Sequence, residues 1–390
     1  MLGYNKEFIE TFYIKQYQLL QLFALWNLPQ EDNISVLWRL AYHLYFWCFF
    51  VVLMILFDCS MILQIITHIG DVDEVIKVFV IFATSVAVMA KYLYIKFYNH
   101  RFVGVFQMMH RHEFLPQNPV EWRIYRKSVD LSRRVRDYYA TLSVSALSGL
   151  FLSQFVGEQK ELPASIYIPF ELNTNFKYSI MYIYQCLSLA VLCFVNVGFD
   201  SMTSSFFINI KGQLDVLGYR LENIGRGECN QWRILRKLKD CIIYYQRILA
   251  MTHLMEVLVC IPILVQIAGS VFVLIANFYS MSMLSDNDDM GNFVKLTLYQ
   301  TCMLTQIFIL CYFANEVSLK SSEISFNLYE SNWYDWNKVN RKLALLMMIR
   351  FDTPIRIKSV NRCYSFNLAA FTSIVNSSYS YFALLKRINS

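Results

Sequence analysis

The run Ser-Ile-Val-Asn-Ser-Ser-Tyr-Ser-Tyr-Phe-Ala-Leu-Leu, from Ser373 to Leu385, lies near the end of the chain and decides how the rest is interpreted. It belongs to a mostly apolar segment, residues 359–385, that is long enough to form a membrane helix. A helix surrounded by lipid would not carry many hydroxyl and amide groups. One side of this helix is therefore expected to face water or protein, although close packing through small residues is the alternative for any single serine. The small polar residues are Ser365, Asn367, Thr372, Ser373, Asn376, Ser377, Ser378 and Ser380.

The whole chain has the composition of a helical membrane protein. Of its 390 residues, 56% are hydrophobic and 16% are aromatic, with only 12 Gly and 7 Pro. A bilayer core about 30 Å thick requires about 20 consecutive apolar residues per helix. We therefore expect an all-α, polytopic membrane protein with seven transmembrane helices. The seven apolar runs cover residues 40–62, 75–98, 138–156, 178–199, 255–283, 293–317 and 359–385.

The distribution of Lys and Arg predicts the orientation of the chain. Of 35 such residues, 10 lie within residues 91–136, 8 within 211–247, 8 within 320–362 and 3 in the N-terminal part. Positive charges concentrate on the cytoplasmic side of membrane proteins. A cytoplasmic N-terminus and, after seven spans, an extracellular C-terminus are expected, in a multi-pass protein of the plasma membrane that contacts lipid. The first thirty residues lack the short apolar core of a cleavable signal peptide.

Apolar stripes at helical spacing divide the chain further. Leu214, Leu217 and Leu221 form one stripe and Leu235 and Leu238 begin another, with a break at residues 225–227. Helices four and five are therefore expected to continue into the cytoplasm and meet residues 318–358. The resulting segments are an amphipathic or re-entrant N-terminal segment (1–37), helices one to six with cytoplasmic extensions (38–317), a cytoplasmic anchor segment (318–358), and the last helix with a short outer tail (359–390).

Several classes of protein are disfavoured by the residues present. The chain has no phosphate-binding Gly-rich loop, no His-Glu-x-x-His and no Gly-x-Ser-x-Gly, which argues against an enzyme, a metal site and a cofactor. The net charge of +6 reflects the loops and predicts no nucleic-acid binding. A secondary transporter would favour buried acidic residues and interrupted spans, whereas the sequence places Asp58, Asp200 and Glu256 at the ends of spans.

Binding of a small apolar ligand is the chemistry that remains. The outer halves of spans two, three, four and six supply aromatic and methionine side chains that bind such ligands by dispersion and desolvation. The alternative is that these aromatic stripes only pack the bundle or form an interfacial belt. The candidate ligand-binding residues are Phe79, Phe82, Phe151, Phe155, Tyr178, Met181, Tyr182, Gln185, Tyr299 and Met303.

The last eighty residues carry a set of separated motifs in a fixed order. These are Cys-Tyr-Phe-Ala-Asn-Glu-Val at 311–317, Trp-Tyr at 333–334, a helix from Arg341 to Arg350 followed by Pro354, and Ser-Tyr-Ser-Tyr-Phe-Ala-Leu-Leu at 378–385. The set resembles the carboxyl-terminal signature of insect odorant receptors. The resemblance implies a tetrameric, ligand-gated, non-selective cation channel that binds a small volatile odorant in the dendrite of a sensory neuron.

The resemblance also implies a partner and a gate. It implies a heterotetramer of an odour-tuning subunit with a shared co-receptor subunit, and this chain looks like the tuning kind because it lacks the long insertion of the co-receptor between spans four and five. The last helix would line the pore, with Tyr379, Phe382, Leu385 and Lys386 on or beside its pore-facing stripe. Phe382 or Leu385 would contribute to an apolar constriction. Four copies of Lys386 around one axis would oppose cation flow, which favours the mixed assembly.

Three alternatives make different predictions. A gustatory receptor of the same superfamily would have a Thr-Tyr-centred ending, which Ser378-Tyr-Ser380 does not match. A seven-helix G-protein-coupled receptor would have its N-terminus outside the cell. A transporter would show stoichiometric uptake instead of an agonist-evoked current.

Overall fold

The computed structural model describes residues 14–22, 36–156, 162–171, 174–227, 230–283, 290–358 and 365–389, and these residues are mostly helical. Within those ranges the extended pairing is limited to one isolated bridge between Lys358 and Ser365. The prediction of an all-α protein is confirmed. The elements are α2 (Ile14–Leu22), α3 (Val36–Phe50), η1 (Val51–Ile55), α4 (Leu56–Thr67), α5 (Val72–Phe97), α6 (Asn99–Met109), η2 (His112–Phe114), α7 (Pro119–Val156), α8 (Asn175–Glu222), α9 (Gln231–Met283), α10 (Met290–Tyr329), η3 (Trp333–Asp335), α11 (Lys338–Phe351) and α12 (Leu368–Asn389).

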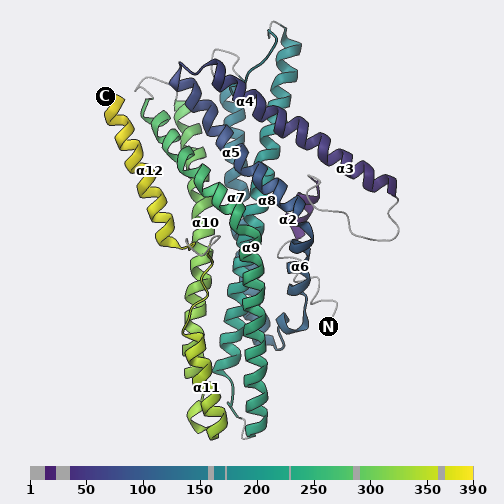
Figure 1. The fold of residues 1–390 in the computed structure, drawn as a ribbon, viewed down its shortest axis with the longest axis vertical. Coiled ribbons are helices and arrows are strands. Elements are labelled where there is room, and N and C mark those ends of the chain that lie inside the picture. Colours follow the sequence, from purple (N-terminus) through teal and green to yellow (C-terminus); the bar gives the residue numbers. More distant parts are fainter. Residues whose placement is uncertain are drawn as a thin grey trace.

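The long helices form an elongated bundle (Figure 1). Helix α8 packs along α7 and α10, and α5 packs along α9. Helix α12 lies on one flank against α9 and α10, while α3 projects from the other side. Helix α11 lies at one end of the bundle, which we call the lower end, and the opposite end is the upper end.

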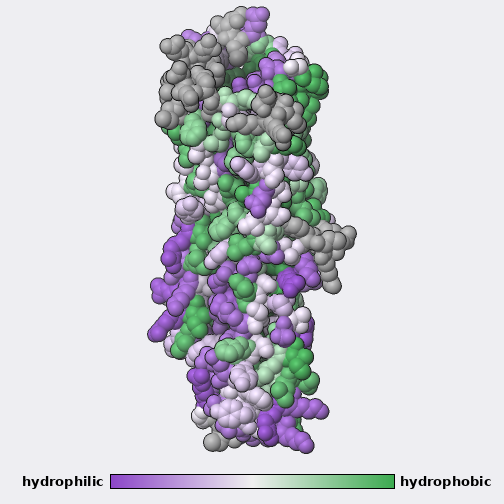
Figure 2. Space-filling model, turned by 90° about the vertical axis from the view of Figure 1, so that its left-hand side faces the viewer, coloured by the Kyte–Doolittle hydropathy of each residue, from purple (hydrophilic) through white to green (hydrophobic). Residues whose placement is uncertain are grey.

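Five helical stretches of the described residues are long and apolar enough to cross a membrane: Leu40–Thr67, Val72–Phe97, Asn175–Glu222, Gln231–Met283 and Gly291–Tyr329. They contain five of the seven predicted apolar runs. The run at 138–156 lies in α7, whose first half is highly charged, and the described part of the last run lies in α12, which is rich in Ser and Asn. The count of seven spans therefore stays a prediction. Figure 2 shows hydrophilic residues gathered over the lower half and hydrophobic residues over much of the rest.

Local sequence explains where several helices begin. The Asp71 side chain accepts a hydrogen bond from the backbone N–H of Glu74 at 3.3 Å and caps α5. Asp73 and Glu74 lie in the first turn, where acidic groups interact favourably with the helix dipole. In the same way, Asn337 accepts a hydrogen bond from the N–H of Asn340 at 2.8 Å at the start of α11.

The predicted break between the stripes of α8 and α9 is confirmed at Gly225 and Gly227. Both have positive φ angles, 83° and 70°, which residues with a Cβ rarely adopt. A Cβ on Gly225 would also lie only 2.6 Å from Nε1 of Trp336. The turn therefore needs glycine both for its backbone and for the close approach of the buried Trp336 indole.

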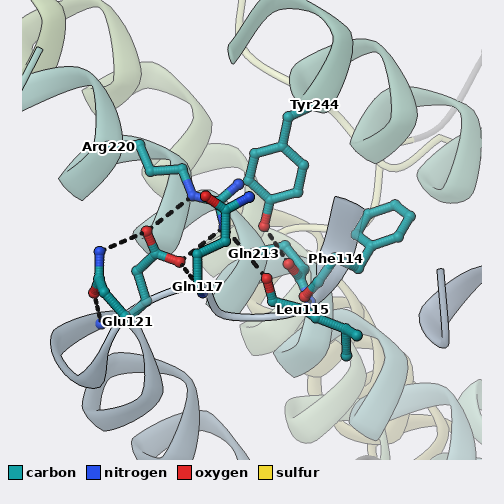
Figure 3. Close-up of polar contacts among 8 residues, drawn as sticks. Phe114, Leu115, Gln117, Glu121, Gln213, Arg220 and Tyr244 are labelled. Carbon is teal, nitrogen blue, oxygen red and sulfur yellow. Dashed lines mark hydrogen bonds and ion pairs between the residues drawn. The ribbon is translucent and has the colours of Figure 1, made fainter. Parts of the chain in front are cut away.

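A polar cluster joins three helices in the lower half, and we call it the Glu121 cluster (Figure 3). Arg220 of α8 donates from Nε and Nη2 to the two carboxylate oxygens of Glu121 of α7, at 3.0 and 2.8 Å. The Arg220 guanidinium lies 4.7 Å from the ring centre of Tyr244 of α9. Tyr244 donates to Gln213, which donates to the carbonyl of Phe114. One buried cluster therefore fixes α7, α8 and α9 relative to each other.

Candidate ion path and ligand-binding sites

One face of α12 is polar and open. The opposite face is buried, with Ile374 7% and Ser378 0% exposed. The sequence predicts that one side of this helix faces water or protein, and the polar face of α12 is that side. The polar face continues along the helix from one turn to the next. The polar face of α12, with Ala369 and Tyr381, lines a shallow groove. The exposed polar residues of this groove are Thr372, Ser373, Asn376, Ser377 and Ser380.

The four candidate gate residues occupy several positions on α12. Tyr379 is exposed, and its ring centre lies 6.1 Å from that of Phe382. Phe382 is half-buried and packs against Phe278 of α9 at 5.8 Å. Neither side chain is among those that line the polar groove. The side chains of Leu385 and Lys386 lie outside the described part of the structure.

Three of the candidate ligand-binding residues meet at the upper ends of α7 and α8. The Tyr182 hydroxyl donates to the backbone carbonyl of Phe151 at 3.3 Å. The rings of Tyr178 and Tyr182 stack with their centres 6.1 Å apart. Met181, also on α8, is half-buried against the main core. The two helices thus present an aromatic surface at this end of the bundle.

A second group links α5 and α10. The hydroxyls of Tyr299 and Thr84 form a hydrogen bond of 2.6 Å. Met303, one turn further along α10, is 5% exposed and belongs to an apolar cluster that includes Ile374 of α12. Sequence reasoning missed Thr84, because its partner lies 215 residues away in the chain and no local pattern marks it. These contacts connect the Tyr299 region directly to the last helix.

Gln185 fixes the loop that precedes α8. Its side-chain oxygen accepts from the N–H of Ala164 at 2.9 Å, and its side-chain nitrogen donates to the carbonyl of Ala164 at 3.1 Å. The N–H of Tyr167 donates to the carbonyl of Ser60 at 3.1 Å. The described part of the loop is therefore hydrogen-bonded to both α4 and α8. Both polar ends of the buried Gln185 amide are already paired without a ligand.

Two of the remaining candidate aromatic residues have other packing partners. Phe79 packs edge-on against Phe272 of α9, with ring centres 6.4 Å apart. Phe82 is half-buried against the main core of the bundle. The side chain of Phe155 lies outside the described residues. The structure thus brings together Tyr178, Tyr182 and Phe151 in one group and Tyr299 and Met303 in another.

A buried ion pair, which we call the Lys91 network, joins the helices in the middle of the bundle. Lys91 of α5 donates to Asp200 of α8 at 2.7 Å and to Asn196 at 2.6 Å. Tyr139 of α7 and Gln266 of α9 each donate to the other Asp200 oxygen at 3.4 Å. The Lys91 and Asp200 side chains are only 0% and 3% exposed. The network therefore connects four helices through groups of opposite charge.

The Lys91 network corrects one placement made from the sequence. Counting Lys91 among the charges of a cytoplasmic loop was wrong, because it is fully buried within α5. Asp58 and Asp200, which the sequence places at the ends of spans, are both buried within α4 and α8, and the positions of the span ends stay a prediction. Glu256 is half-buried within α9 and accepts a hydrogen bond from the N–H of Lys358 at 2.6 Å.

Long apolar helices, buried polar contacts between them and an open polar face on the last helix define a multi-pass helical membrane protein. The family model described as 7tm Odorant receptor matches residues 71–379. The chain therefore belongs to the insect odorant receptor family.

Known proteins resemble the chain over two thirds of its length or more. Odorant receptor 46a, isoform A, of Drosophila melanogaster is 40% identical, over 98% of this chain and 99% of that protein. Odorant receptor Or2 of Anopheles gambiae is 24% identical, over 69% of this chain and 75% of that protein. The structure of the insect olfactory receptor OR5 from Machilis hrabei in complex with eugenol has the same fold, with a TM-score of 0.85, 15% identity and 99% of both chains covered. These relatives are odorant and olfactory receptors.

Proposed function

We propose that this chain is the odour-tuning subunit of a ligand-gated, non-selective cation channel, with its N-terminus in the cytoplasm and its C-terminus outside the cell. A small volatile organic molecule binds in the outer half of the helix bundle. The channel is a heterotetramer with a co-receptor subunit in the plasma membrane, and α12 lines its pore. The eugenol complex of OR5 supports a volatile organic ligand, because the two chains share a fold.

The open polar face of α12 is the observation that carries this proposal. Hydroxyl and amide groups facing hydrocarbon are costly, so a membrane helix directs such groups towards protein or water. In this chain the groove from Ala369 to Tyr381 faces outward. Copies of α12 meeting around an axis would turn this face towards a shared aqueous path. Tyr379 would border that path, and Phe382 and Leu385 would narrow it.

An apolar cluster supports coupling between ligand and pore. Val80 of α5, Val273 of α9, Met303 of α10 and Ile374 of α12 pack in one buried cluster, with Tyr299 at its edge. A ligand that displaces Tyr299 or Met303 would therefore change the packing of α12. Close-packed side chains transmit such displacements because the interior has little free volume.

Exposed apolar residues at the lower end support assembly. Val339, Leu346 and Ile349 of α11 are 65%, 55% and 71% exposed, and Phe326 of α10 is 58% exposed. Soluble surfaces rarely carry so many adjacent apolar groups unless another molecule covers them. We assign this surface to contacts between subunits.

Current recording in cells tests the proposal. Odorant-evoked cation currents are expected when the chain is expressed with the co-receptor subunit, and weak or no currents when it is expressed alone, because of Lys386. Full currents from the chain alone would contradict the argument from Lys386. Staining of an N-terminal tag on intact cells would contradict the proposed orientation.

Replacing Tyr299 tests the ligand site. Tyr299→Ala is expected to change the ratio of half-maximal concentrations between two odorants by about three- to tenfold, since one aromatic contact contributes about 0.5–1.5 kcal/mol. Phe155→Ala is also expected to change this ratio. The measurement is the concentration–response curve across a volatile panel, together with surface expression.

Tyr219→Ala, which removes a half-buried tyrosine from the lower end of α8, is the matched control and should leave the odorant ranking unchanged. Unaltered ranking in both Tyr299→Ala and Phe155→Ala, at normal surface expression, would remove these residues from the site.

A further inference from the structure

The segment that leads into α12 is held against two other helices, and we call it the α12 linker (residues 352–358). The N–H of Ile355 donates to the Ser321 hydroxyl of α10 at 2.7 Å. The N–H of Lys358 donates to Oε1 of Glu256 of α9 at 2.6 Å. Ile355 is 8% exposed and packs into the main core of the bundle. The backbone of the linker is therefore fixed to α9 and α10 before α12 begins.

Further hydrogen bonds connect the linker to the start of α12. Lys358 pairs with Ser365 in the isolated antiparallel bridge. The side-chain nitrogen of Asn367 donates to the Ser365 hydroxyl at 3.3 Å, and its side-chain oxygen accepts from the N–H of Ala370 at 2.8 Å. Asn367 thus caps α12, which begins at the next residue. A continuous series of contacts therefore joins Glu256 to the first turn of α12.

Helix α9 contacts α12 and its linker at two separate levels. At the upper level, Phe278 packs against Phe382 with ring centres 5.8 Å apart. At the lower level, Glu256 holds the linker. Pro262 lies between these two contacts inside α9 and has no N–H to bond the carbonyl of Leu258. Proline is a common cause of helix bending, so the upper part of α9 can move relative to Glu256.

The contacts of the Glu256 carboxylate indicate the linker as its main partner. Oε1 accepts the 2.6 Å bond from the linker, whereas Oε2 lies 3.6 Å from Nδ1 of His253, whose side chain is 72% exposed. Exposed ion pairs contribute little, and a hydrogen bond to a carboxylate is stronger than one between neutral groups. Glu256 also lies in the predicted apolar run 255–283, where an acidic residue is costly. The bond to the linker accounts for an acidic residue at this position.

We propose that Glu256 is a positioning residue for α12, which holds the start of the helix in place and thereby sets the balance between the closed and the open channel. This inference rests on the proposed function, in which α12 lines the pore. A change in that balance multiplies the apparent dissociation constant of every ligand by the same factor, because it changes the fraction of channels that is competent to bind. A residue that touches the ligand would instead change the constants of different odorants by different factors.

Current recording with the co-receptor subunit and three chemically different odorants tests this role. Glu256→Ala is expected to shift all three half-maximal concentrations by one common factor of about three to ten, the range for one hydrogen bond. Lys358→Pro removes the N–H donor of the same bond and should give a similar shift. The double variant should shift the concentrations no further than either single variant, because both substitutions remove one interaction.

Two further variants are the controls. Glu256→Gln keeps an oxygen that accepts the linker N–H and should shift the concentrations less than Glu256→Ala. Lys358→Ala removes the side-chain charge but keeps the backbone N–H, so it should leave the half-maximal concentrations unchanged. A role confined to folding would lower surface expression and maximal current in Glu256→Ala without a common shift.

Negative results distinguish this role from the channel function itself. No odorant-evoked current from the wild type with the co-receptor overturns the channel function, and the role of Glu256 with it. Wild-type currents together with unchanged half-maximal concentrations in Glu256→Ala, or with shifts that differ between odorants, overturn the role of Glu256 alone. If Glu256→Ala does not reach the cell surface, Ser321→Ala replaces it. This variant keeps the carboxylate but removes the second linker bond, and the absence of a common shift in it also overturns the proposal.

Discussion

Lys91→Met is expected to destabilise the protein by about 3–5 kcal/mol and to reduce its surface expression strongly. The substitution keeps the apolar stem of the side chain but leaves the 3%-exposed Asp200 without its counter-charge. Breaking a buried pair by removing one partner has a cost in this range because an uncompensated charge stays buried. The measurement is the midpoint of thermal unfolding in detergent together with surface labelling in cells.

A second substitution separates charge from packing. Asp200→Asn added to Lys91→Met removes the stranded charge and keeps an amide that can pair with Tyr139 and Gln266. The double variant is therefore expected to recover most of the lost stability. Lys77→Met is the matched control, because the Lys77 side chain is 67% exposed in its pair with Glu74 and should change stability by less than about 1 kcal/mol. A double variant as unstable as Lys91→Met would show that charge is not the cause.

Arg220→Ala is expected to lower the free energy of unfolding by about 3 kcal/mol, because it breaks the contacts that hold the Glu121 cluster together. The substitution removes two hydrogen bonds to the Glu121 carboxylate, which is 3% exposed, and the stacking on Tyr244. The cost is placed at the lower end of the range for buried pairs because the Arg220 side chain is 15% exposed. Arg220→Lys keeps the charge but loses the paired geometry and the stacking, so an intermediate loss is expected.

The neighbouring Arg226 provides the control for Arg220. It lies in the turn after α8 and pairs with Glu222, the last residue of that helix, but its side chain is 51% exposed. Arg226→Ala should therefore change the thermal midpoint little, since exposed pairs of this spacing contribute about 0.3–0.5 kcal/mol. Equal losses in Arg220→Ala and Arg226→Ala would contradict the role of the Glu121 cluster in joining α7, α8 and α9.

The helical class and several helix boundaries could be predicted from the sequence because they depend on local patterns. Apolar runs predict membrane helices, the stripe of Leu214 and Leu217 predicts the extension of α8, and Gly225 predicts its end. Lys91 shows where this reasoning fails. A hydropathy scale treats each charged residue separately, whereas the free-energy cost of burying Lys91 depends on its pairing with Asp200, 109 residues later in the chain. A buried charge was therefore assigned to a loop.

The candidate site was predictable in part. Residue type identified Tyr299 and Met303 as wall residues of a ligand site, and the structure places Met303 within the cluster that includes Ile374 and Tyr299 against it. Residue type could not give the rotation of each helix, which decides whether a side chain points inward. Phe79 consequently packs against Phe272, while Thr84, on a different side of α5, pairs with Tyr299.

The double hydrogen bond between Gln185 and Ala164 has a consequence for natural variation within the family. An insertion or deletion between Pro163 and Ile168 would free both ends of an inaccessible amide, and an orphaned amide of that kind disfavours folding. Changes in the length of the loop that precedes α8 are therefore expected to occur together with substitution of Gln185. Lineages that acquire a new loop should show a new residue at position 185 as well.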